Sequence, residues 1–133
     1  MNKILEDINK CVDSCTHFVH YDIAVIASKI FKNMYRYLGS SQWEYYDIQT
    51  KTWVKDFKAN RFKNDIDYVI GDIFIHRALY WYELSKNYND IHDEMRAKFM
   101  YEKMLRASYI IKNMKYISIV IKEAKGFFDI HNG

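Results

Sequence analysis

The feature that most constrains the fold of this chain is the near absence of residues that interrupt helices. The 133 residues include no proline and only four glycines. Proline and glycine are the residues that most often end or kink a helix. Along most of the chain, apolar residues recur every three or four positions, a spacing that places them on one face of a helix. We therefore predict a mainly α-helical protein, a bundle of about five helices that forms a single domain over residues 1–133.

The apolar spacing divides the first two thirds of the chain into three helices. The first covers residues 3–14, and the second covers residues 22–38, from a capping Asp22 to a terminating Gly39. A long third helix extends over about residues 64–86. Its expected buried stripe consists of Ile66, Ile70, Ile73, Tyr80 and Leu84, with Arg77 in the missing place.

The C-terminal third carries two further helical patterns after a polar break at residues 87–90. The apolar positions of the first are Met100, Met104, Ala107, Ile111 and Met114. The last segment, residues 117–128, either continues this helix or follows a kink near Asn113. The methionines on these stripes fit a packed core, and they also fit an adaptable groove for a partner protein.

Residues 42–56 depart from the helical spacing. Trp43 and Tyr45 alternate with Glu44 and Tyr46, which is the period of a β-strand. Residues 47–51 have the composition of a turn, and residues 52–55 return as a second strand. We predict an inserted two-stranded β-hairpin at about residues 42–56, with Trp43, Tyr45 and Trp53 as structural aromatics. An isolated hairpin is only marginally stable, so Trp43 and Tyr45 should face the helices.

Composition argues against a secreted or membrane protein. The chain has no apolar run long enough to span a bilayer and no signal-peptide pattern. Its two cysteines, Cys11 and Cys15, do not amount to a disulfide framework, as is usual in a reducing compartment. We expect an intracellular protein, in the host cytoplasm or nucleus if it is viral, without contact to a membrane.

Basic residues are concentrated toward the C-terminus. The net charge of the whole chain is +3, whereas residues 95–125 contain eight Lys or Arg against Glu102 and Glu123. Such a run is either a solvated helix face or a surface for phosphate groups. Adding basic residues of the third helix and the hairpin gives the candidate DNA-binding residues Arg77, Arg96, Lys103, Arg106, Lys112, Lys115, Lys122, Lys125, Lys51 and Lys55.

Candidate metal and catalytic groups are sparse. Cys11 and Cys15 lie one helical turn apart, with His17 and His20 close behind, but the spacing is that of no zinc finger and equally suits two packed thiols. Asp72 and His76 could form an acid–base pair, yet no nucleophile elbow, Gly-rich phosphate loop or His-Glu-x-x-His motif accompanies them. We expect no catalytic residue, no metal and no cofactor.

Aromatic residues surround a basic pair in the stretch of residues 76–82, HRALYWY. Stacking of bases on Tyr or Trp beside a phosphate-binding Arg is one way to hold single strands, and core packing is the other explanation. Because Tyr80 falls on the apolar stripe, the pattern predicts that Trp81 or Tyr82 is exposed.

The order of these motifs resembles that of a known domain. The matching residues are His20, Asp22, Ile23 and Ala24 at a helix start, then Trp43, Tyr45, Tyr46, Trp53 and Val54 in the hairpin, and Lys122, Glu123 and Ala124 near the end. From about residue 16 to residue 129, the chain is similar to the helical domain that precedes the superfamily-three helicase in poxvirus-type primase-helicases of large DNA viruses and phages. No helicase core or primase catalytic domain is recognisable in it.

The resemblance implies a non-catalytic part in DNA replication. Its expected partners are DNA and other replication subunits, and membership of a helicase would imply a homo-oligomer. ATP-dependent helicase and primase activities of the family belong to other domains, so this chain alone is not expected to be an enzyme. The alternative is a small helical module of viral or phage type that binds another protein and no nucleic acid.

Overall fold

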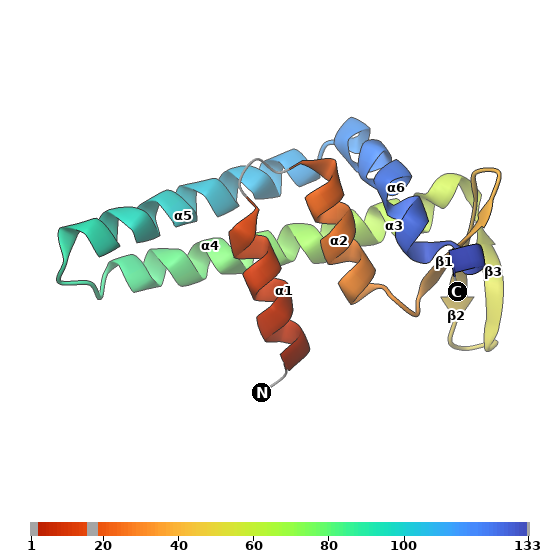
Figure 1. Cartoon of the computed structure of the whole chain (residues 1–133), viewed down its shortest axis with the longest axis horizontal. Helices are drawn as coiled ribbons and strands as arrows, with labels where there is room; N and C mark the ends of the chain where they lie inside the picture. Colours follow the sequence, from red (N-terminus) through yellow and green to blue (C-terminus); the bar gives the residue numbers. More distant parts are fainter. Residues whose placement is uncertain (1–2, 16–18, 133) are drawn as a thin grey trace.

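The computed structural model describes residues 3–15 and 19–132, and it confirms a mainly helical fold. The described part contains five helices and one small sheet (Figure 1). The longer helical segments are α1 (Lys3–Ser14), α2 (His20–Ile30), α3 (Asn60–Asp65), η2 (Ile66–Ile70), α4 (Gly71–Ser85), α5 (Ile91–Ile111) and α6 (Met114–Phe128). The predicted third helix is continuous through α3, the π-helical turn η2 and α4. The strands are β1 (Tyr35–Gly39), β2 (Gln42–Asp47) and β3 (Thr52–Asp56).

The molecule is elongated, with a long helix pair at one end and the sheet at the other (Figure 1). Helices α4 and α5 run antiparallel, and α1 and α2 lie against their middle. Helix α6 packs against α2 along one part of its length and against strand β1 near its end.

The last two helices each begin at a side-chain cap. Asp90 accepts the His92 N–H at 2.7 Å at the start of α5, and Asn113 accepts the Tyr116 N–H at 3.1 Å at the start of α6. Thus the chain does break near Asn113.

The predicted bounds of the second helix, residues 22–38, were wrong, because α2 begins at His20 after the N-cap Val19 and Asp22 lies in its first turn. Helix α2 ends at Ile30, and residues 35–39 form a strand in which the buried Tyr35 and Tyr37 alternate with less buried neighbours. This strand pairs antiparallel with β2, with Tyr37 opposite Trp43. The predicted hairpin of β2 and β3 exists, but it is part of a three-stranded sheet in the order β1-β2-β3. A third strand supplies the pairing and packing that a two-stranded hairpin lacks.

The inner face of the sheet closes the helical core. Trp43 is 3% exposed, and its ring lies 5.2 Å from that of Phe62 and 5.8 Å from that of Phe128. Tyr45, on the same face, packs against this cluster. Trp53 is on the outer face, where the Arg36 guanidinium lies 4.4 Å from its ring centre. Within the hairpin, Trp43 and Tyr45 therefore face the helices, and in β1 the buried Tyr35 does the same by stacking on Phe62 at 4.3 Å. Trp53 packs with the sheet's outer side chains.

The buried stripe of the third helix differs from the predicted one after Ile70. Residues 66–70 form a π-turn, which accommodates one extra residue and rotates everything that follows. The buried positions are therefore Ile66, Ile70, Gly71, Phe74, Ala78, Trp81 and Ser85. Tyr80 is exposed, contrary to the expectation. Of Trp81 and Tyr82, one of which was expected to be exposed, Tyr82 is exposed and Trp81 is buried.

A polar cluster fastens α1 to the long helix pair. The Asp13 carboxylate accepts two hydrogen bonds from Arg77, at 3.1 Å and 2.6 Å, and one from the Trp81 indole N–H at 3.1 Å. Lys103 donates to the Asp13 backbone carbonyl at 3.3 Å. The Arg77 side chain is only 14% exposed. Helices α1, α4 and α5 therefore meet at Asp13, and the Arg77 guanidinium is paired with its carboxylate.

Within the described residues, no helix combines the length and apolar character needed to cross a lipid bilayer.

Candidate nucleic-acid interface

Four lysines surround one hollow between α6 and the sheet end of the molecule. The hollow has a volume of about 190 Å³, and the residues lining it are Ser41, Trp43, Lys58, Ala59, Lys63, Ser118, Ile121, Lys122 and Lys125. Ser41 comes from the turn between β1 and β2, and Lys58 from the connection of β3 to α3. Lys63 lies on α3, and Lys122 and Lys125 lie on α6. We call Lys58, Lys63, Lys122 and Lys125 the lysine cluster.

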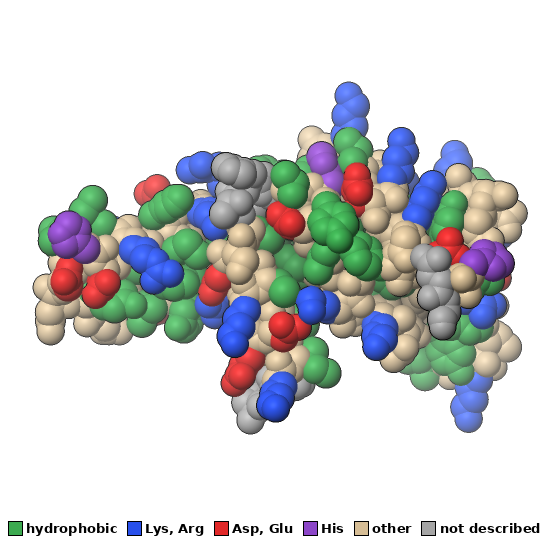
Figure 2. All heavy atoms as spheres, viewed as in Figure 1, with side chains coloured by type: hydrophobic (Ala, Val, Ile, Leu, Met, Phe, Trp, Pro, Cys, Tyr) green, Lys and Arg blue, Asp and Glu red, His purple; other side chains and the backbone are tan. Residues whose placement is uncertain are grey.

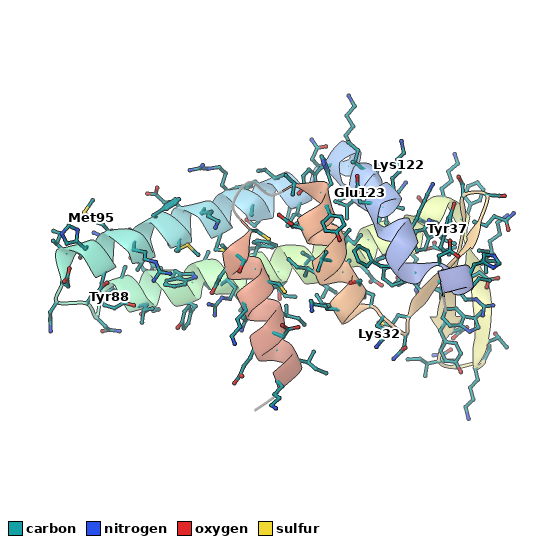
Figure 3. The ribbon with its side chains drawn as sticks, viewed as in Figure 1. Lys32, Tyr37, Tyr88, Met95, Lys122 and Glu123 are labelled. Carbon is teal, nitrogen blue, oxygen red and sulfur yellow. The ribbon has the colours of Figure 1, made fainter. Side chains whose placement is uncertain are left out.

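Helix α6 presents its lysines on one face. Lys115, Ser118, Lys122 and Lys125 follow one another at spacings of three or four residues, so they lie along one side of the helix. The opposite side, which includes Val120 and Ala124, is buried. Lys122 projects outward in Figure 3, and blue side chains follow α6 along the upper edge of Figure 2. Because the apolar side of α6 is buried in the core, its lysine side faces outward.

Lys125 is positioned by an aromatic neighbour. Its ammonium lies 5.3 Å from the centre of the Tyr37 ring, within the range of a cation–π contact. The Tyr37 hydroxyl in turn accepts the Ser41 N–H at 2.9 Å. Strand β1, the β1–β2 turn and α6 are therefore connected at the rim of the hollow.

The connection between β3 and α3 has an unusual backbone. Lys58 and Ala59 both adopt the left-handed conformation, with φ of 54° and 55°, although neither is glycine. The buried Asp56 carboxylate holds this turn, because it accepts the N–H groups of Arg61 at 2.9 Å and Phe62 at 3.0 Å. Left-handed non-glycine residues carry strain, and such residues concentrate at functional sites.

A second left-handed turn lies across the hollow. Ser40 and Ser41, which connect β1 to β2, have φ of 50° and 60°. The tight turn brings the Ser41 side chain to the rim beside the lysines. Two strained turns therefore flank one cluster of positive charge.

The cluster is electrically uncompensated. In the described parts of the chain, none of its four lysines forms an ion pair, and no acidic side chain lines the hollow. Glu123 is the next residue to Lys122 but points to a different side of α6 (Figure 3). Four ammonium groups without a carboxylate in the hollow give this surface the charge that attracts a polyanion.

Three of the predicted DNA-binding residues make intramolecular contacts elsewhere. Arg77 and Lys103 belong to the cluster around Asp13. Lys112 forms an ion pair with Asp67 at 3.2 Å, which joins the end of α5 to the π-turn. These side chains stabilise the fold, and they lie apart from the lysine cluster.

The remaining predicted residues are dispersed. Arg96 stands 5.6 Å from the Trp81 ring centre on the long helix pair, and Arg106 is exposed on α5. Lys51 is in the β2–β3 turn, while Lys55 on β3 lies opposite Glu44. Of the ten predicted residues, only Lys122 and Lys125 line the hollow, and Lys115 extends their row along α6.

Lys58 and Lys63 were missed by the sequence analysis. They lie outside the basic run of residues 95–125, in a stretch from Lys55 to Lys63 that holds four basic residues and a single acidic one, Asp56. Since Asp56 is buried as a cap, this short run is more basic at the surface than its composition suggests. A count of local charge over shorter windows would have found it.

The possible metal and acid–base groups form no comparable site. Among the described residues, no three His, Cys, Asp or Glu side chains are grouped to hold a metal, and His17 lies outside those residues. Burial, followed by the negative charge of Asp22, raises the pKa of the Cys15 thiol to about 12, so it remains protonated at neutral pH. Asp72 and His76 approach to 3.2 Å but are both exposed on the surface of α4.

Lys58→Gly should separate binding from stability. Glycine adopts a positive φ without strain, and the exposed Lys58 side chain contributes little packing, so the free energy of unfolding should rise by about 0.5–1 kcal/mol. Affinity for DNA should fall, because one of four lysines is lost. Urea unfolding and a DNA titration on the same preparation check both signs. A loss of stability would show that the turn depends on the lysine side chain.

Comparison with protein-family models, with curated proteins and with solved structures found no match to this chain.

Proposed function

We propose that this protein is a non-catalytic module that binds the phosphate backbone of nucleic acid through the lysine cluster. The observation that carries the proposal is the convergence of four lysines without ion pairs, from two separate segments, on one hollow. Lys115 lengthens the surface along α6. Such contacts position a protein on DNA and do not read its sequence.

The resemblance to the domain preceding superfamily-three helicases supports a setting in DNA replication. In that setting the module holds DNA or neighbouring subunits next to a catalytic domain that is separate from it. The two cysteines, neither in a disulfide, support an intracellular location. The proposed activity is binding alone, because the family's catalytic groups lie in domains other than the one this chain resembles.

Salt dependence is the direct test of this function. A labelled strand of about 20 nucleotides and the matching duplex are titrated with the protein at several salt concentrations, with fluorescence anisotropy as readout. Release of counterions by about four phosphate contacts predicts a slope of about −3 to −4 for log K against log salt. Scrambling the sequence should leave affinity unchanged. Absence of binding at low salt, or a slope near zero, would refute the proposal.

A further inference from the structure

Helix α5 has two apolar faces, and the described residues cover one of them. Its buried face, with Met100, Met104 and Ala107, packs in the core of the long helix pair. On the opposite face Met95, Phe99 and Tyr109 are 61%, 57% and 71% exposed. Met95 projects away from α4 near the end of the pair (Figure 3). Single exposed apolar residues are common, but a row of them along one helix marks a contact surface.

Two opposite charges interrupt this row. Glu102 and Arg106 lie on the same exposed face, between Phe99 and Tyr109. In the part of the chain that the structure describes, neither forms an ion pair. We call Met95, Phe99, Glu102, Arg106 and Tyr109 the α5 stripe.

The α5 stripe of one copy is complementary to the α5 stripe of a second copy that runs in the opposite direction. Glu102 and Arg106 lie two residues before and after Met104, and Phe99 and Tyr109 lie five residues before and after it. If two α5 helices run antiparallel with a twofold axis at the level of Met104, Glu102 meets Arg106 of the partner subunit twice. The same register brings Phe99 level with the partner's Tyr109. A twofold interface requires this reciprocity, in which residue i meets j and j meets i.

We infer that the protein self-associates as an antiparallel dimer through the α5 stripe. The partner that covers the stripe is a second copy of this chain, because that copy presents a matching apolar row and the opposite charge at each of Glu102 and Arg106. Helix α5 has 21 residues, about 31 Å of length, so one helix from each copy forms a small interface. Interfaces of that size belong to weak complexes, and dissociation in the micromolar range is expected.

Sedimentation of the full chain without nucleic acid tests the inference. Between about 1 and 300 µM the mass should rise from 16.1 kDa toward twice that value, 2 × 16.1 = 32.2 kDa. Phe99→Ala should weaken association by about 10-fold. A chain that stays monomeric over the whole range would overturn the inference.

Charge reversal tests the antiparallel register. Glu102→Arg and Arg106→Glu should each abolish self-association, because like charges then face each other at two places. An equimolar mixture of these two variants should form a heterodimer, and the double variant E102R/R106E should dimerise again. Glu6→Arg, an exposed reversal on α1, should leave association unchanged. If the mixture stays monomeric or the single variants still dimerise, the register is wrong.

Discussion

Replacing Trp43 with alanine should lower the free energy of unfolding by about 3–5 kcal/mol, the range for large aromatic side chains in a core. Trp43 is where the sheet meets α3 and α6, and its ring lies 5.0 Å from Tyr37 in addition to its contacts with Phe62 and Phe128. Alanine would leave a cavity at this junction that rigid neighbours cannot fill. Urea unfolding followed by circular dichroism measures the loss.

Trp53→Ala is the matched control for that experiment. It removes the same side chain from the adjacent strand, but Trp53 is on the outer face and only partly buried. We expect a loss of about 1 kcal/mol. Equal losses for the two variants would mean that the sheet is not attached to the helices through Trp43.

Asp13→Ala should lower the free energy of unfolding by about 3 kcal/mol, the second large effect. The substitution removes the acceptor of three side-chain hydrogen bonds and leaves the mostly buried Arg77 guanidinium without a counter-charge. Deleting one partner of a buried ion pair costs more than replacing both. Adding Arg77→Met should therefore recover part of the loss, and a double-mutant cycle measures the coupling.

Asp7→Ala provides the comparison on the same helix. Asp7 also pairs with a basic residue, Lys29 at 2.8 Å, but both side chains are well exposed. Exposed pairs contribute between 0 and about 1 kcal/mol. If Asp13→Ala cost no more than Asp7→Ala, α1 would not be held in place by the Asp13 cluster.

The sequence predicted the fold class because its helix signals are local. The absence of proline, the apolar spacing and the alternation around Trp43 are each visible within a few residues. Strand β1 was missed because Met34 and Leu38 continue the helical spacing of the second helix and hide the alternation of Tyr35 and Tyr37. Pairing with β2 decides between helix and strand. The π-turn could not be foreseen, since a single inserted residue depends on what packs around it.

The candidate site was predictable only in part, for a related reason. The basic face of α6 follows from residue spacing, so Lys122 and Lys125 were identified. Their convergence with Lys58 and Lys63 depends on how β3 and α3 fold back against α6, which no local pattern contains. Conversely, Arg77 and Lys103 carry the right charge, yet Asp13 engages both of them.

If the lysine cluster is the binding site, affinity for DNA depends on the place of the positive charge and not on its total. The most direct measurement compares two variants of equal net charge by anisotropy with the same labelled DNA at low salt. One is Lys122→Glu with Lys125→Glu in the lysine cluster. The other is Lys3→Glu with Lys32→Glu, two exposed positions without ion pairs among the described residues. Lys32 lies on the opposite edge of the molecule from Lys122 (Figure 3).

Both variants change the net charge from +3 to −1, since each reversal removes two units and 3 − 4 = −1. The cluster variant should lose on the order of 1,000-fold in affinity, because each reversal turns an attraction of about 1 kcal/mol into a similar repulsion, about 4 kcal/mol for the two sites together. The control variant should lose less than about 5-fold, through the long-range field alone. Equal losses in the two variants would contradict the account, because binding would then follow total charge and the lysine cluster would not be the site.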